Sequence, residues 1–224
     1  MKKSASVLLS VLIALLVALF ILSVSIALPI LIRPLYYIQI TSLELPEYME
    51  SLSYDQIKTC YDEMLDYCLG LRSEFSVGGL RFSEEGVSHF DDVRTLFFID
   101  FAVAGISAFL LAVLAVVLKL TKIKPCKILG RSAPFWSVAS IGTASSLIAL
   151  ACAIDFDTTF DIFHKIFFVG KTNWAFDPYT DPIILLLPHQ FFISCAIMIF
   201  ASVLIFSAAI LLYEFLPRRK LIND

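Results

Sequence analysis

The stretch VLLSVLIALLVALFILSVSIALPILI, residues 7–32, decides the fold of this 224-residue chain. It contains no charged side chain and exceeds the roughly 20 helical residues that cross the hydrocarbon core of a bilayer. Three further apolar runs are comparably long: Leu96–Leu120, Trp136–Ile154 and Phe191–Leu216. Backbone groups inside lipid must bond within their own segment, so each run is predicted to be a helix. A hydrophobic content of 59% and a mean hydropathy of +0.86 agree with a membrane all-α four-helix bundle.

The first run has a second interpretation, because Lys2 and Lys3 followed by apolar residues also begin a secretory signal. A signal has an apolar core of about 7–15 residues and a cleavage site of small residues. The present run is longer, and Pro34 follows it instead of such a site. We therefore favour a retained membrane helix.

The distribution of charge predicts the orientation of the four helices. The loop between the second and third runs is basic and has no acidic residue, and basic residues also flank both ends of the chain. Basic loops remain cytoplasmic, so both termini are expected there. The predicted order is helix 1–32, outer segment 33–95, helix 96–120, cytoplasmic loop 121–135, helix 136–154, outer segment 155–190, helix 191–216 and cytoplasmic tail 217–224. Most of the 20 acidic residues then lie outside, which argues against a nucleic-acid partner.

The outer segment 33–95 is predicted to fold as a small α+β extracellular cap. Tyr36–Leu45 is rich in β-forming residues and predicts a strand. A Ser-x-x-Gln capping box at Ser53 begins a helix that Gly70 is suited to end. Phe75–Phe82 has two short apolar arms around consecutive glycines, which is typical of a hairpin.

From Ser83 to Leu120 the pattern predicts one helix that begins outside and enters the membrane. Glu85, His89 and Asp92 then share a helical face at spacings of four and three. A carboxylate can orient one histidine nitrogen so that the other exchanges a proton, so these residues form a candidate acid–base unit. The alternative is a helix start with solvated charges.

The second outer segment contains the stretch FDIFHKIFFVGKTNW, residues 160–174, in which His164 lies among aromatic residues. On a helix, Asp161, His164 and the pair Phe167 and Phe168 could share a face. The density of aromatic rings exceeds that of an ordinary interfacial belt and suggests an apolar chamber above the outer leaflet. The alternative is an amphipathic anchor with a single polar ring.

Other kinds of site are less well supported by the sequence. Three histidines and many carboxylates could bind zinc, but no H-x-x-x-H, H-E-x-x-H or CxxC spacing is present. No metal and no cofactor are therefore predicted. The absence of a G-x-S-x-G elbow disfavours a serine hydrolase. His189 is most simply the polar start of the last helix, and Asp100 is either a site residue or a carboxylate that reaches outward.

Two blocks of the sequence carry a resemblance to a known family. HFDDVRTLF, residues 89–97, and FHKIFFVGKTNWAFDPYTDPIILLLPHQFF, residues 163–192, resemble conserved blocks of the bacterial lipoprotein intramolecular transacylases. The length, the four spans and the two outer segments agree as well. Phe90 departs from the pattern, in which a methionine is expected.

The resemblance implies an enzyme of the bacterial cytoplasmic membrane with its active site on the extracellular face. Its substrate would be a diacylated lipoprotein within membrane lipid, and it would move the sn-2 acyl chain of the diacylglyceryl group to the α-amine of the N-terminal cysteine. The two catalytic histidines of the family correspond to His89 and His164. The order in which they act as base and acid stays open, as does the oligomeric state.

Further roles are predicted around this pair. Glu85, Asp92 and Asp161 would support the histidines, and Arg94 would assist them. The residues expected to contact glyceryl, oxyanion or lipid are Phe163, Phe167, Phe168, Asn173, Trp174 and Asp177. Two other functions remain as alternatives, a non-enzymatic four-span scaffold or accessory subunit and a histidine-dependent lipid ester hydrolase.

Overall fold

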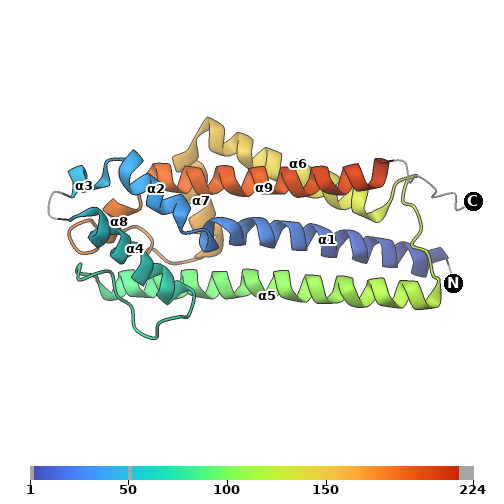
Figure 1. Cartoon of the computed structure of the whole chain (residues 1–224), viewed down its shortest axis with the longest axis horizontal. Coiled ribbons are helices and arrows are strands. Elements are labelled where there is room, and N and C mark those ends of the chain that lie inside the picture. The colour runs from blue at the N-terminus through green and yellow to red at the C-terminus, as the bar shows by residue number, and fades with distance from the viewer. Residues whose placement is uncertain (1–2, 50–51, 217–224) are drawn as a thin grey trace, which may run out of the picture. The chain divides into compact units, whose positions relative to one another are not determined.

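The structure is a computed structural model that describes residues 3–49 and 52–216 (Figure 1). The basic residues predicted to orient the chain at Lys2 and in the tail, Arg218, Arg219 and Lys220, lie outside these ranges. The helices of the described part are α1 (Lys3–Leu31), α2 (Pro34–Ser42), α3 (Leu45–Tyr48), α4 (Tyr54–Cys68), α5 (Glu84–Thr121), α6 (Ala133–Ile154), α7 (Phe156–Phe167), α8 (Ile183–Leu186) and α9 (His189–Phe215).

Four of these helices are long and apolar enough to cross a membrane, namely α1, α5, α6 and α9. They coincide with the four predicted runs, and α5 begins well before the apolar part of its run, as predicted. The chain divides into two compact units, each containing parts of these helices. The first consists of the described residues up to Ser25, Val103–Leu147 and those from Phe200 onward; the second consists of Ile26–Ala102 and Ile148–Ile199.

The first unit is held together in part by serine hydroxyls that bond to backbone carbonyls of other segments. Ser10 in α1 donates to the carbonyl of Cys126 in the basic loop at 2.8 Å. Ser137 in α6 donates to the carbonyl of Ala14 at 2.8 Å. Small polar residues allow membrane helices to approach closely and bond to one another.

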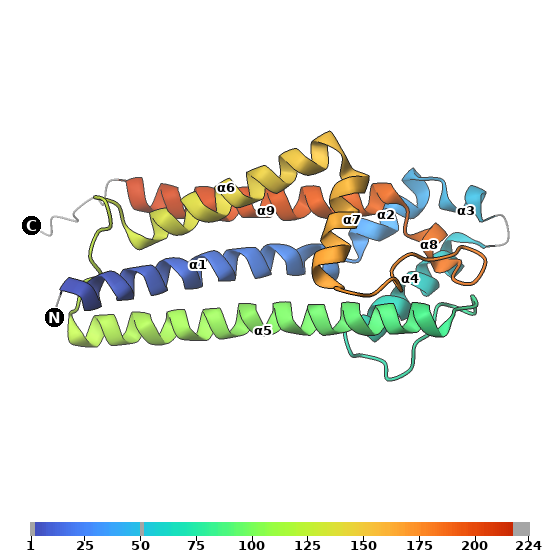
Figure 2. The ribbon, with the colours of Figure 1, turned by 180° about the vertical axis from the view of Figure 1, so that it is seen from behind.

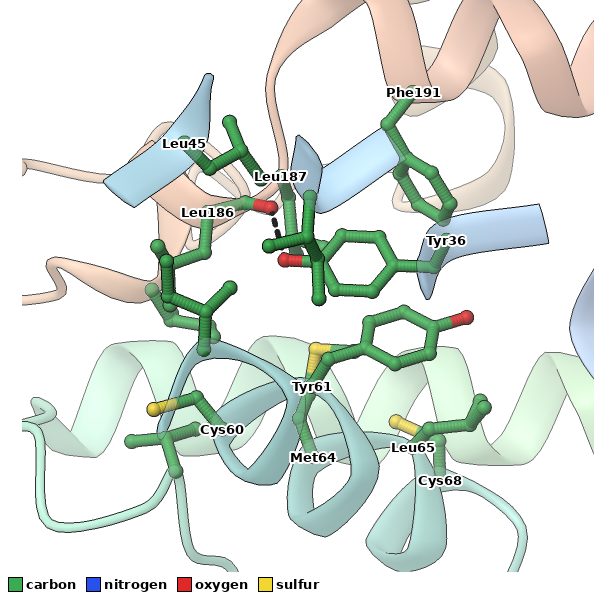
Figure 3. Packing of buried hydrophobic residues seen from close by; sticks show 14 of the residues in the cluster. Tyr36, Leu45, Cys60, Tyr61, Met64, Leu65, Cys68, Leu186, Leu187 and Phe191 are labelled. Atoms are coloured by element: carbon green, nitrogen blue, oxygen red, sulfur yellow. Dashed lines mark hydrogen bonds between the residues drawn. The ribbon is translucent and has the colours of Figure 1, made fainter. Parts of the chain in front are cut away.

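The second unit has a compact apolar core around α2, α4 and α8 (Figure 3). Tyr36 stacks on Tyr61 with ring centroids 3.8 Å apart, and its hydroxyl donates to the carbonyl of Leu186 at 2.7 Å. This hydrogen bond satisfies the hydroxyl of the wholly buried Tyr36 side chain, and it joins α2 to α8. The turned view in Figure 2 shows the same grouping of α2, α4 and α8.

The predicted strand at Tyr36–Leu45 is wrong, because this segment forms α2 and the start of α3. Pro34 occupies the first turn, where its fixed φ and missing N–H suit a helix. Tyr36 and Ile40, four residues apart, are both fully buried. Burial of this helical face outweighs the local preference of the β-branched and aromatic side chains.

The predicted hairpin at Phe75–Phe82 is also wrong, because no strand forms in the part of the chain that the structure describes. The glycines do make a turn, with φ of +63° at Gly78 and +87° at Gly79. The Leu80 N–H closes this turn by donating to the carbonyl of Val77 at 3.1 Å, but the turn also bonds to α4: Ser76 Oγ and the Gly78 N–H both donate to Glu63 Oε2, at 2.5 and 2.7 Å. The described part of the cap therefore consists of helices and loops: the expected strand is a helix, and the expected hairpin is a loop.

The helix predicted from Ser53 is confirmed as α4, and both bonds of its capping box are present. Gly70 follows its last residues with φ of +72°, a left-handed conformation that glycine adopts without strain. The buried face of α4 includes Ile57, Tyr61 and Leu65.

Candidate functional site

The first turns of α5 carry His89. Ser83 begins the helix, since its hydroxyl accepts a hydrogen bond from the Gly86 N–H at 2.9 Å. A helix of 38 residues is ~57 Å long, almost twice the roughly 30 Å of a hydrocarbon core. Its polar start therefore extends beyond the lipid-spanning part. His89 is 6% exposed, although it lies in this polar region.

α7 carries His164. Asp155 caps this helix by accepting a hydrogen bond from the Thr158 N–H at 3.0 Å, and the chain bends there between α6 and α7 (Figure 2). His164 is 7% exposed, whereas Phe163 and Lys165 beside it are exposed. The histidine therefore lies on the inward face of an amphipathic helix.

The hydrogen bonding of His164 defines which nitrogen is available for chemistry. Its Nδ1 lies 2.8 Å from the carbonyl oxygen of Phe160, one turn earlier. A carbonyl can only accept, so Nδ1 carries a proton, and in the neutral ring Nε2 holds the lone pair. This hydrogen bond fixes the orientation of the His164 ring, and Nε2 remains available as a hydrogen-bond acceptor.

The rings of His89 and His164 lie close together, with centroids 6.0 Å apart and an interplanar angle of 31°. The ring of Phe168 contacts both, at 4.9 Å from His89 and 5.5 Å from His164. Trp174 lies 4.8 Å from His164, and Phe176 lies 5.3 Å from His89. Two buried titratable rings therefore lie together among aromatic side chains, an arrangement called here the aromatic enclosure.

Burial has a different consequence for each of the two imidazole rings. Burial lowers the pKa of His164 below its usual value of 6.5, outweighing the opposite effects of the Phe160 carbonyl and the Asp161 charge. The Nδ1 atom of His89 is buried and has no hydrogen-bond partner among the described residues. Buried polar atoms are usually paired, and exceptions are common at functional sites.

A polar network joins α5 to the loop that follows α7. Asp92 accepts from Lys171 Nζ at 2.5 Å and from Asn173 Nδ2 at 3.2 Å. The same amide group lies 3.3 Å from Ser88 Oγ, and the Asn173 Oδ1 atom is buried without a partner in the described part of the chain. The predicted residues Asp92 and Asn173 are thus brought together. Asp92 bonds to the loop, and its charge also acts on His89: burial lowers the pKa of that ring, and the charge of Asp92 raises it by a smaller amount.

The structure separates several other predicted residues from the two rings. Glu85 and Asp161 are exposed, although the charge of Asp161 still raises the pKa of His164 against the larger effect of burial. The guanidinium of Arg94 lies over the rings of Tyr67 and Phe98, at 5.1 and 5.8 Å. Arg94 therefore packs against the cap helix α4.

The predicted substrate-contact residues fall into two groups. Phe168 and Trp174 contact the histidines, whereas Phe163 and Phe167 are 44% and 52% exposed. Asp177 is exposed and accepts from the Tyr179 N–H at 2.8 Å, so it stabilises the turn that follows. Its position indicates a structural contribution to the loop.

Three residues near the histidines were not predicted from the sequence. The ring of Phe160 lies 4.2 Å from His164, Phe176 contacts His89, and Lys171 pairs with Asp92. The spacing of four between Phe160 and His164 on a helix was a usable signal. The loop residues gave no comparable signal, because their approach to α5 is a long-range contact. Among the described residues, no group of three His, Cys, Asp or Glu side chains could hold a metal.

These features define a class: a four-span membrane protein with two histidines in an aromatic enclosure. The sequence profile of the family described as lipoprotein intramolecular transacylase Lit matches residues 11–192. The chain belongs to this family, which confirms the resemblance and the assignment as an acyltransferase. No curated protein sequence matches at a significant level.

Solved structures agree with this fold. The membrane-integral lipoprotein intramolecular transacylase Lit of Bacillus cereus is 24% identical, with a TM-score of 0.84 over 96% of each chain. Variants of that protein with one histidine changed to alanine or to arginine give TM-scores of 0.78 and 0.73, at 24% and 21% identity. The alanine variant matches over 96% of this chain and 94% of its own, and the arginine variant over 95% of each. At these identities the likeness supports the fold alone.

Proposed function

We propose that this protein converts diacylglyceryl lipoproteins into the lyso form by intramolecular acyl transfer. The α-amine of the N-terminal cysteine attacks the sn-2 ester carbonyl; a C–N bond forms and the ester C–O bond breaks. The ammonium first loses a proton to a histidine, and the departing glyceryl oxygen gains one. The product is an N-acylated cysteine with a lyso-glyceryl thioether.

The observation that carries this proposal is the His89–His164 pair, with ring centroids 6.0 Å apart. One reaction needs a proton acceptor at the amine and a proton donor at the ester oxygen, and two neighbouring imidazoles supply both. The lowered pKa of His164 keeps that ring neutral and able to accept a proton at neutral pH. No acyl-enzyme intermediate is required.

The aromatic enclosure supports transfer to the amine over hydrolysis. Phe168, Trp174 and Phe176 contact the two imidazoles, which are buried from solvent. An amine held against the ester in an attack geometry gains a large effective concentration. Water that could compete for the ester is excluded from such a site.

The position of α7 supports access from lipid. It follows the span α6 with one residue between them, and its outward side chains Ile162, Ile166 and Phe167 are 50%, 63% and 52% exposed. A helix with such an apolar face suits the boundary between headgroups and acyl chains. We place the site at the outer leaflet, since the basic residues Lys122, Lys124 and Lys127 follow the other end of α5.

Mass spectrometry of a lipoprotein N-terminus tests the proposal. The protein is expressed in bacteria whose lipoproteins are diacylated and unmodified at the amine. We expect N-acylated cysteine carrying a monoacylglyceryl group, at unchanged total mass. Unchanged diacylglyceryl termini would refute the function. Release of free fatty acid without N-acylation would favour the lipid ester hydrolase.

A further inference from the structure

The carboxylate of Asp181 lies at the end of the loop that follows α7 and is 3% exposed. Its oxygens accept hydrogen bonds from the Ser83 N–H and from Ser83 Oγ, each at 2.8 Å. Thr180 Oγ1 donates a third bond at 2.7 Å. A buried carboxylate is costly unless it is bonded in this way. Two of these bonds come from the residue immediately before α5, so Asp181 ties this loop to the helix that carries His89.

Gly86 makes this close approach possible. A Cβ atom at this position would lie 2.2 Å from Asp181 Oδ1 and 3.2 Å from Cε1 of Phe176. Glycine inside a helix costs about 1 kcal/mol relative to alanine. The missing side chain lets the carboxylate reach the first turn of α5, where the helix dipole also favours a negative charge.

The same contact connects to both histidines. Phe176 lies against His89 at 5.3 Å, and the same loop carries Trp174, which lies 4.8 Å from His164. His89 lies one turn after Gly86 on α5. A loop held at Asp181 therefore keeps Phe176 and Trp174 in contact with their respective rings.

We propose that Asp181 is a positioning residue for the acyl transfer: its bonds to Ser83, permitted by Gly86, set the distance between the two histidines. The inference rests on the proposed function. Asp181 touches neither ring and acts through Phe176 and the loop. A displacement of about 1 Å in a catalytic group can lower the rate ~100-fold.

The test is a cycle of variants assayed on a purified diacylglyceryl lipopeptide in lipid. Asp181→Asn and Gly86→Ala are expected to lower kcat per folded enzyme about 10- to 100-fold with little change in KM. Both should also lower the thermal unfolding temperature, because each disturbs a buried, closely packed contact. The acid limb of the pH–rate profile should also move, because the spacing of the two imidazoles sets their mutual electrostatic effect. Asp55→Asn, an exposed carboxylate in the first turn of α4, is the matched control and should match the wild type.

The double variant separates positioning from general damage. Asp181→Ala removes the Oδ1 atom that lies 2.2 Å from the Cβ position at Gly86 and leaves the 3.2 Å approach of Phe176 Cε1, so adding Gly86→Ala should cost less activity in this background than it does in the wild type. Equal costs of Gly86→Ala in both backgrounds would overturn the inference. So would kcat values that follow only the folded fraction, or an unshifted pH profile.

Hydrogen exchange of residues 168–182 gives a readout independent of the reaction. Asp181→Asn should accelerate exchange in this loop, and Asp55→Asn should not. If the wild type formed no lyso product, the proposed function would fail, and exchange alone would decide whether Asp181 holds the loop. Unchanged exchange would then overturn the inference as well.

Discussion

The imidazole of His89 in α5 lies with its centroid 6.0 Å from that of His164 in α7, and Phe168 contacts both rings. At this separation the two imidazoles are close enough to act on neighbouring atoms of one substrate. The relationship joins two segments far apart in the sequence. Both neighbours of His164 along the chain are exposed, whereas His89 is followed by the buried Phe90.

Replacement of either histidine is expected to abolish most of the activity. General acid–base catalysis contributes about 10²–10⁴-fold, so His89→Ala and His164→Ala should each lower the rate of lyso-lipoprotein formation by at least ~100-fold. The measurement is the initial rate by mass spectrometry, at matched amounts of folded protein.

The third histidine provides the control for this prediction. His189 pairs with Asp157, with Nδ1 and Oδ1 2.7 Å apart, and both side chains are partly or fully exposed. His189→Ala should retain activity near that of the wild type. Full conversion by both His89→Ala and His164→Ala would refute the mechanism even if the function were correct.

The pH dependence of the rate follows from the burial of His164. Its pKa lies below the usual 6.5, so the ring stays neutral as the pH falls through that value and is protonated only at lower pH. The acid limb of kcat should therefore lie below pH 6.5. Asp161 raises this pKa, so Asp161→Asn should move the limb further toward acid. An acid limb above pH 6.5 would contradict the assignment of a buried neutral ring.

Much of this fold could be predicted from the sequence, because lipid leaves the backbone few choices. Four apolar runs had to be helices, and the capping box at Ser53 and the start signal at Ser83 marked two helix beginnings correctly. The pairing of His89 with His164 was suggested by the resemblance. The residues alone placed both histidines on the same outer face, and the resemblance identified them as a catalytic pair.

The errors came from contacts between distant residues. Tyr36 and Ile40 were predicted to lie in a strand, yet the segment is a helix because both side chains are buried against α4 and α8. The bonds of Asp181 to Ser83, like the pairing of Lys171 with Asp92, depend on where a loop returns in space. Arg94 was expected at the site because it lies in the block HFDDVRTLF, but its guanidinium packs over the ring of Tyr67.

Two neighbouring glycines in the cap give a matched stability test. Gly79→Ala meets only the strain of a positive φ, since no atom lies within 4 Å of its Cβ position. Its cost should be about 1 kcal/mol. Gly78→Ala adds a collision with Cys60 Sγ at 2.6 Å, and should cost about 1–3 kcal/mol more. Thermal unfolding in detergent measures both, and equal shifts would show that the turn does not pack on α4 in this way.

The outward face of α7 is expected to contact acyl chains. Ile166 is 63% exposed and apolar, while Lys165 lies next to it and offers a charged position for comparison. In the variant Ile166→Trp, phospholipids with brominated acyl chains should strongly quench the fluorescence of the new tryptophan. A tryptophan at Lys165→Trp should be quenched less, because its side chain leaves the helix about 100° away. The native tryptophans contribute equally to both variants and cancel in the comparison. Equal quenching would mean that α7 does not present this face to lipid, and the acyl chain would then have to reach His164 by another route.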